Sequence, residues 1–423
     1  MMGGAKKRVP KRRFKEFLNA GEWKERKLSE LATMNARIGW QNLRTSEFLD
    51  SGDYLLITGT DFDNGRVKYS TCHYVEKKRF DQDTKIQLST GSILITKDGT
   101  LGKVALVEEL PKPATLNAGV FNVRVKDDTV LSYKYLYHYL KAPFLMKYVT
   151  ANATGGTIKH LNQSILVDFP IPITEKPEQD RITKLLDSLE SSITLHQRKL
   201  DKLQATKKAL LQEMFPEEGQ NKPKRRFKGF TDAWEQRKLT DIAKTFIGLV
   251  TTMTENYRDS GTLLIRNSDI KEGQFIFSEK PIHLDEEFAE KNKTRRLQIG
   301  DVVTVHTGEI GTSAVIKEKE AGAIGFATIN TRTDKRILNP YFLSTYFNTD
   351  KHKCYANSVS TGDGRSNYNI KDFNKLVISI PTLDEQEKIS AIINNINTII
   401  TLHQRKLDKL KNLKQAYLNE MFV

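Results

Sequence analysis

The sequence predicts an α+β fold, in which two pseudo-symmetric α/β domains are joined and separated by two long antiparallel coiled-coil helices. Two observations lead to this prediction: the chain repeats itself at an offset of 207 residues, and each half ends in a long heptad pattern. The length of 423 residues agrees with it, because single hydrophobic cores stop growing near ~250 to 300 residues.

The repeat is clearest at the two ends of each half. Residues 193–203 read ITLHQRKLDKL, and residues 400–410 read the same eleven letters. The front of each half is also duplicated, as PKRRFK at residues 10–15 and 223–228. Chance does not produce such matches, so the two halves are copies of one unit.

The middle of each half keeps a pattern while its sequence changes. Residues 91–107 (GSILITKDGTLGKVALV) align with residues 300–316 (GDVVTVHTGEIGTSAVI). Both segments read as two apolar strands around a polar turn. Each turn holds two glycines three residues apart, and we expect these glycines to adopt positive φ. One fold with two different surfaces suggests two modules that do the same job on different targets.

The expected organisation follows from the repeat and from a linker rich in Pro, Gly and polar residues near 216–224. It comprises a leading segment (1–32), a first module (33–173), a central spacer helix (174–215), a linker with the second leading segment (216–243), a second module (244–381) and a C-terminal spacer helix (382–423).

The two spacer helices are predicted from apolar residues that recur every 3.5 positions for more than four heptads. We expect them to pair along a seam formed by Ile182, Leu186, Leu189, Ile193, His196, Leu200, Leu203, Ile389, Ile393, Ile396, Ile400, His403, Leu407 and Leu410. Polar seam residues can fix the register of a coiled coil, so His196 and His403 indicate pairing more than metal or proton chemistry. About 38 residues at 1.5 Å each give a rod of roughly 57 Å, and helix length then sets a distance.

Composition narrows the class of protein. The chain is 38% hydrophobic and 28% charged, as ordinary globular proteins are. It has no stretch long enough for a membrane span and no signal-peptide core, so we expect it in the cytoplasm. Lys and Arg number 67 against 52 Asp and Glu, a net charge of +15, which favours nucleic acid as the partner.

Catalytic and metal motifs are not found. Residues 339–342 (NPYF) are similar to the Asn-Pro-Pro-aromatic motif of adenine-N6 methyltransferases, but the second proline is missing. The repeat places Ser132 opposite Asn339, and both residue types cap helices, so this segment is predicted to start a helix. Two cysteines make neither a disulfide framework nor a zinc site. We therefore expect a chain that binds and does not catalyse, with no catalytic residue and no metal ligand.

Binding residues are expected on the loops that differ most between the two modules. Arg, Lys, Asn and Thr are the residue types that contact base edges and phosphates. The candidates for DNA contact are Lys97, Thr100, Thr154, Thr157, Lys159 and His160 in the first module, and Arg266, Asn267, His306, Thr307, Arg365 and Asn367 in the second.

Taken together, these motifs resemble the specificity subunit of a type I restriction-modification system. The resemblance covers nearly the whole chain and rests on the WKERKL and WEQRKL segments, the two divergent modules and the duplicated helices. It implies that each module is a target recognition domain reading one half of a split DNA site. It also implies that the helices form an antiparallel spacer that docks the methyltransferase subunits.

The resemblance further implies partners and cofactors outside this chain. These are double-stranded DNA, two methyltransferase (modification) subunits and restriction subunits, with S-adenosylmethionine, ATP and Mg held by the partner subunits. Two other hypotheses remain open from the residues alone. The chain could be a stand-alone DNA methyltransferase or nuclease, or a coiled-coil adaptor that binds proteins.

Overall fold

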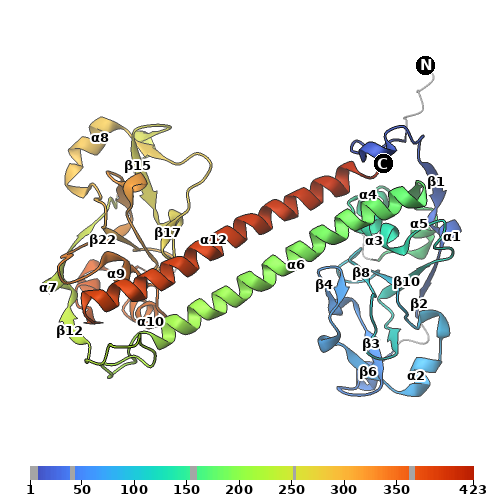
Figure 1. Ribbon diagram of the computed structural model, residues 1–423, viewed down its shortest axis with the longest axis horizontal. Coiled ribbons are helices and arrows are strands. Elements are labelled where there is room, and N and C mark those ends of the chain that lie inside the picture. The colour runs from blue at the N-terminus through green and yellow to red at the C-terminus, as the bar shows by residue number, and fades with distance from the viewer. Residues whose placement is uncertain (1–7, 39–42, 153–159, 251–253, 362–366) are drawn as a thin grey trace. The chain divides into compact units, whose positions relative to one another are not determined.

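The computed structural model describes residues 8–38, 43–152, 160–250, 254–361 and 367–423. The chain divides into two compact units, Met1–Leu195 with Lys406–Val423 (unit 1) and His196–Arg405 (unit 2). Two helices of 38 residues, α6 (Lys176–Glu213) and α12 (Leu383–Glu420), contribute to both units (Figure 1). Within the described ranges, no helix is both long and apolar enough to cross a membrane.

Unit 1 holds the first module, whose chain alternates short strands and short helices. In order they are β1 (Lys24–Lys27), α1 (Leu28–Leu31), β2 (Ala32–Ala36), β3 (Tyr54–Ile57), β4 (Phe62–Asp63), β5 (Arg66–Val67), β6 (His73–Val75), α2 (Lys77–Asp81), β7 (Ile93–Thr96), β8 (Val104–Leu106), β9 (Ala114–Leu116), β10 (Val120–Val125), α3 (Tyr133–Lys141), α4 (Phe144–Asn152), α5 (Gln163–Val167) and β11 (Pro170–Ile173).

Three sheets organise this module. The main sheet has the order β2-β10-β7-β8-β5-β4, a second has β6-β3-β9, and β1 pairs with β11. The predicted hairpin is the antiparallel pair β7–β8, with Ile93 opposite Leu106. Its turn bends at Gly99 and Gly102, whose φ angles of 70° and 71° confirm the positive values expected there.

Unit 2 repeats the plan with the second module. Its elements are β12 (Glu235–Lys238), α7 (Leu239–Ile242), β13 (Ala243–Ile247), β14 (Tyr257–Arg258), β15 (Thr262–Arg266), β16 (Ile270–Lys271), β17 (Gln274–Phe275), β18 (His283–Leu284), α8 (Glu286–Lys291), β19 (Val302–Val305), β20 (Ser313–Val315), β21 (Ile324–Phe326), β22 (Thr328–Thr333), α9 (Pro340–Phe347), α10 (Asp350–Ser358), α11 (Ile370–Phe373) and β23 (Val377–Ile380).

The sheets of unit 2 correspond to those of unit 1. The order β13-β22-β19-β20 matches β2-β10-β7-β8, the sheet β14-β18-β15-β21 takes the place of β6-β3-β9, and β12 pairs with β23 as β1 does with β11. Helix α8 lies beside β15 (Figure 1), and Thr262 of β15 donates a hydrogen bond to Glu286 of α8 at 3.0 Å. Helix α9 begins as predicted, because the Asn339 side chain accepts the Tyr341 and Phe342 amides at 2.8 and 3.2 Å.

The start of each long helix is held by a buried ion pair that recurs in both units. Glu178 of α6 accepts two hydrogen bonds from Arg13 at 2.6 and 2.8 Å. Glu385 of α12 accepts the same pair from Arg226 at 2.8 and 2.6 Å. Both carboxylates are almost fully buried, and the planar guanidinium satisfies both oxygens at once. The second arginine of each PKRRFK segment therefore ties a leading segment to a helix.

Within each unit the two long helices run antiparallel. In unit 1, Ile182 and Leu186 of α6 share a core with Leu418 near the end of α12 and with Met421 directly after it. In unit 2, the end of α6 packs in one core with Ile389 near the start of α12. The predicted α+β fold with two modules and two long paired helices is confirmed at this level.

The residues predicted to form the helix seam differ in their degree of burial. Those that are buried are Ile182, Leu186, Leu189, Leu200, Ile389, Ile393, Ile396, Leu407 and Leu410, and those that are half-buried are Ile193, His196, Leu203, Ile400 and His403. The two histidines, both in unit 2, meet with 2.8 Å between their Nδ1 atoms.

Candidate nucleic-acid interface

The turn that follows the central strand lies at the same place in both modules. Strand β7 ends at Thr96 and leads into Lys97, while β19 ends at Val305 and leads into His306. A segment from about 60 residues further along returns to this turn in each case. The Leu161 amide donates to the Lys97 carbonyl at 2.8 Å, and the Tyr368 amide donates to the His306 carbonyl at 2.9 Å. Loops that are distant in the sequence thus meet at the end of one strand.

A second strand end carries a short 3₁₀ turn fixed by an aspartate. In the first module, β3 is followed by Gly59–Asp61, and Asp61 accepts the amide and the hydroxyl of Thr58 at 2.8 Å each. In the second, β15 is followed by Asn267–Asp269, and Asp269 accepts the Arg266 amide at 2.9 Å. These turns set the direction of the polar residues after each strand.

In the second module four of the predicted residues form one hydrogen-bonded cluster. The Asn267 amide group donates to the Thr307 carbonyl at 2.9 Å, so the two strand ends are joined directly. The Thr307 hydroxyl donates to the side chain of Asn367 at 2.9 Å, and it lies 2.8 Å from Nδ1 of His306. Among the described residues, the side-chain oxygen of Asn267 is buried without a hydrogen-bond partner.

The electrostatic character of this cluster is close to neutral. Burial lowers the pKa of His306 below its ordinary value of 6.5, so the ring is uncharged at neutral pH. The guanidinium of Arg266 is held by its own Asp269, at 3.1 and 2.9 Å, and does not add a free positive charge. The cluster therefore offers neutral donors and acceptors, which suit base edges better than phosphates.

The first module places charged groups at the same site. Nδ1 of His160 lies 2.5 Å from the carboxylate of Asp98, and both side chains are well exposed. The ammonium of Lys97 lies 5.7 Å from the centre of the Phe121 ring, a cation–π geometry. Thr100 is exposed in the turn between the two glycines. The two modules thus present different chemistry on one framework.

The structure therefore describes some of the predicted residues and not others. It places Lys97, Thr100 and His160 together at one strand end, and Arg266, Asn267, His306, Thr307 and Asn367 at the corresponding end. Thr154, Thr157, Lys159 and Arg365 lie outside the described residues.

Arg37 is a residue that the sequence reasoning missed. It follows β2 and is buried, and its Nε donates to the Leu116 carbonyl at 2.8 Å. Leu116 is in register with Ile57 at the end of β3, so Arg37 lies at the same edge as Thr58. Its Nη1 has no hydrogen-bond partner among the described residues. Burial lowers its pKa, and no local sequence pattern marks a buried arginine of this kind.

Comparison with known proteins identifies what the chain is similar to. The family model of the type I restriction modification DNA specificity domain matches residues 20–205 and 231–412. The chain is 22% identical over 350 residues to the type I restriction enzyme EcoBI specificity subunit of Escherichia coli, covering 78% of this chain and 72% of that protein. It is 20% identical over 418 residues to the MjaVIII specificity subunit of Methanocaldococcus jannaschii, covering 94% and 95%.

A solved structure shows the same fold. The crystal structure of the type I restriction-modification S subunit from M. genitalium aligns with a TM-score of 0.62 at 15% identity. The alignment covers 98% of this chain and 99% of that chain. The similarity therefore extends over both modules and both long helices.

Proposed function

Because the chain belongs to the family of type I restriction-modification DNA specificity proteins, we propose that it is the subunit that selects the DNA sequence for such a system. Each module reads one half of a bipartite, asymmetric site in double-stranded DNA. The half-sites are centred about one helical turn apart, ~10 base pairs, since both modules face one side of the duplex. As DNA is the partner, the proposed place of action is the cytoplasm.

The observation that supports this function best is the duplicated strand-end site. One framework carries Lys97, Asp98 and His160 in the first module and Asn267, Thr307 and Asn367 in the second. Two modules with the same backbone fold but different hydrogen-bonding side chains are suited to reading two different half-sites. A catalytic function would instead require shared chemistry in both copies or a single complete centre.

The long helices are proposed to set the distance between the half-sites and to dock two methyltransferase subunits, with restriction subunits completing the complex. Leu195 and Leu402 occupy the same position in the repeat, and they are 52% and 59% exposed. A matched pair of exposed leucines is suited to two copies of one partner. S-adenosylmethionine, ATP and Mg are assigned to these partner subunits, and the chain itself is proposed to be non-catalytic.

Sequencing of methylated adenines in cells that carry the chain with its partners tests this function. We expect a split motif, and a single continuous motif would contradict the proposal. Replacing Asn267 and His306 by Ala should relax one half of the motif and leave the other unchanged. The reciprocal variant His160→Ala should relax only the other half.

Two binding measurements separate the alternatives. Isothermal titration with S-adenosylmethionine should give no binding to the isolated chain, whereas tight binding would support a stand-alone methyltransferase. DNA affinity should fall steeply as salt rises, because phosphate contacts release counterions. Affinity that is insensitive to salt would favour a protein-binding adaptor.

A further inference from the structure

A cluster of ionisable side chains joins the first module to the long helices in unit 1. It comprises three basic residues on α3, two carboxylates on α6 and one lysine on α12: Lys134, His138, Lys141, Asp187, Glu190 and Lys414. Asp187 lies 2.9 Å from the Lys134 ammonium and 2.8 Å from Nε2 of His138. Glu190 accepts hydrogen bonds from Lys141 at 2.7 Å and from Lys414 at 2.6 Å.

These charges are little exposed and depend on one another. The side chain of Glu190 is 11% exposed, and those of Lys141 and Lys414 are 16% and 17% exposed. Burial alone would raise the pKa of Glu190, but Lys141 and Lys414 lower it to about 2. Burial lowers the pKa of Lys141 to about 8 in spite of Glu190. A buried charge that loses its partner is strongly destabilising, so each side of this interface requires the other.

In unit 2 the corresponding positions are uncharged on both sides. At the offset of 207, the three basic residues of α3 become Tyr341, Thr345 and Asn348. The two carboxylates of α6 become Asn394 and Asn397 of α12. Tyr341, Asn394 and Asn397 line one small pocket, which places these positions together in unit 2 as well. The changes at Lys134 and Lys141 thus remove positive charge from the module, and those at Asp187 and Glu190 remove negative charge from the helix. The change at His138 removes a ring whose pKa burial holds below 6.5.

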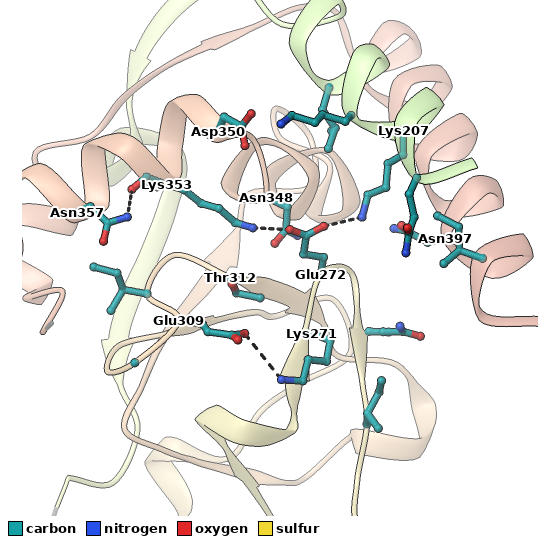
Figure 2. A pocket seen from close by; sticks show the side chains of 18 residues that line it. Lys207, Lys271, Glu272, Glu309, Thr312, Asn348, Asp350, Lys353, Asn357 and Asn397 are labelled. Atoms are coloured by element: carbon teal, nitrogen blue, oxygen red, sulfur yellow. Dashed lines mark hydrogen bonds and ion pairs between the residues drawn. The ribbon is translucent and has the colours of Figure 1, made fainter. Parts of the chain in front are cut away.

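One charge of the cluster is retained, and its partner comes from a different element. Lys207 of α6 corresponds to Lys414, and it donates to Glu272 at 2.7 Å. Glu272 lies in the turn between β16 and β17, where it also accepts a hydrogen bond from Lys353 of α10 (Figure 2). Burial would raise the pKa of Glu272, yet Lys207 and Lys353 hold it below the ordinary value. The first module has Asn64 at this place, in the turn between β4 and β5.

We propose that residues 187 and 190 of the first long helix, and 394 and 397 of the second, are matching positions that fit each helix to its own module. The carboxylates of Asp187 and Glu190 pair with the basic side chains of α3 in the first module. Asn394 and Asn397 face the uncharged α9 of the second module. In that module the carboxylate comes from Glu272, in the turn between β16 and β17. An exchangeable recognition unit therefore comprises a module together with the helix segment through Glu190 or Asn397, and a module alone is incomplete.

A full-length chimera tests this matching. Residues 24–173 replace residues 235–380, because Lys24 pairs with Ile173 and Glu235 with Ile380 at equivalent ends of the two ladders. The copy of α3 then faces Asn394 and Asn397. Adding Asn394→Asp and Asn397→Glu should raise the melting temperature of the chimera, by on the order of 5 °C or more. The same two substitutions in the parent chain should lower its melting temperature or leave it unchanged.

The matched control is Asn395→Asp with Thr398→Glu. It adds the same charges one residue further along α12, on exposed positions, and should change the chimera by no more than about 1 °C. The proposal is overturned if the chimera gains no more from the 394/397 pair than from this control. It is equally overturned if the parent chain gains as much as the chimera.

If the chimera does not fold, a mutant cycle in the parent chain tests the same proposal. One variant carries Asp187→Asn and Glu190→Asn, a second carries Lys134→Tyr, His138→Thr and Lys141→Asn, and a third carries all five. The third should melt higher than the first, because Lys134 and Lys141 no longer lack their carboxylate partners, whereas Lys414 is unpaired equally in both variants. Melting losses that simply add would overturn the proposal. The readout is stability, so its failure leaves the assignment of DNA reading untouched.

Discussion

Replacing Glu190 by Gln removes one charge and almost no volume. The amide keeps the shape of the side chain but leaves the ammonium groups of Lys141 and Lys414 in a poorly solvated site without a carboxylate between them. Tyr137, whose hydroxyl donates to Glu190 at 3.3 Å, keeps an acceptor in the amide oxygen. The variant therefore isolates the electrostatic part of the interaction.

The size of the effect follows from the pKa of Glu190. A carboxylate whose pKa falls from 4.5 to about 2 on folding stabilises the folded state by about 3 kcal/mol at neutral pH. Breaking a buried ion pair by removing one partner costs a similar amount, roughly 3 to 5 kcal/mol. In a unit of this size 1 kcal/mol shifts the melting temperature by about 2–4 °C, so a loss of roughly 6–12 °C is expected.

Thermal unfolding followed by circular dichroism measures this loss, on the transition that belongs to unit 1. Asn397→Gln is the matched control, since it places the same amide at the corresponding position of unit 2 without removing a charge. The control should melt within about 2 °C of the unaltered chain. Equal melting of the two variants would refute the electrostatic account of Glu190.

The same variant predicts a pH dependence. The folded state lowers the pKa of Glu190, so its stabilisation is complete above the unfolded value near 4.5 and is lost as the pH falls toward about 2. The difference in stability between the unaltered chain and Glu190→Gln should therefore narrow as the pH falls from about 5 to about 2. A difference that stays constant down to pH 2 would assign the loss to packing.

Three further outcomes are expected. Arg226→Gln should lower the melting temperature of unit 2 by several degrees, because Glu385 is buried and would lose both of its hydrogen bonds; an unchanged melting curve would show that water replaces the guanidinium. Gly311→Ala should cost about 1 to 3 kcal/mol in denaturant unfolding, because φ is +82° and the added Cβ would lie 3.3 Å from His352, whereas an unchanged midpoint would contradict strain at this turn. The fragment 1–215 should dimerise in analytical ultracentrifugation, because α6 of a second copy would take the place of α12. A strictly monomeric fragment would count against this pairing.

Much of the fold was predictable because the long helices carry a strong local signal. The heptad pattern predicted about 38 residues for each helix, and α6 and α12 have that length. The pattern of a polar turn between two apolar segments predicted the hairpins, and Asn339 before a proline predicted the start of α9. Each of these signals lies within a few residues of the feature that it predicts.

What could not be predicted depends on contacts between distant segments. The arginines of the two leading segments counted toward a surface that attracts a polyanion, yet Arg13 and Arg226 are buried against glutamates more than 150 residues away. The charge of an arginine does not show whether it binds DNA or forms a buried ion pair, because the fold determines which carboxylate lies beside it.

The contact between His196 and His403 has a consequence for the symmetry of the molecule. Two nitrogens at 2.8 Å share one hydrogen, so one ring must present N–H while the other presents a lone pair. The two imidazoles therefore hold different protonation states or different tautomers at any moment. Eleven residues that are identical letter for letter in the two halves thus cannot be chemically identical in the folded chain, and a single proton distinguishes them.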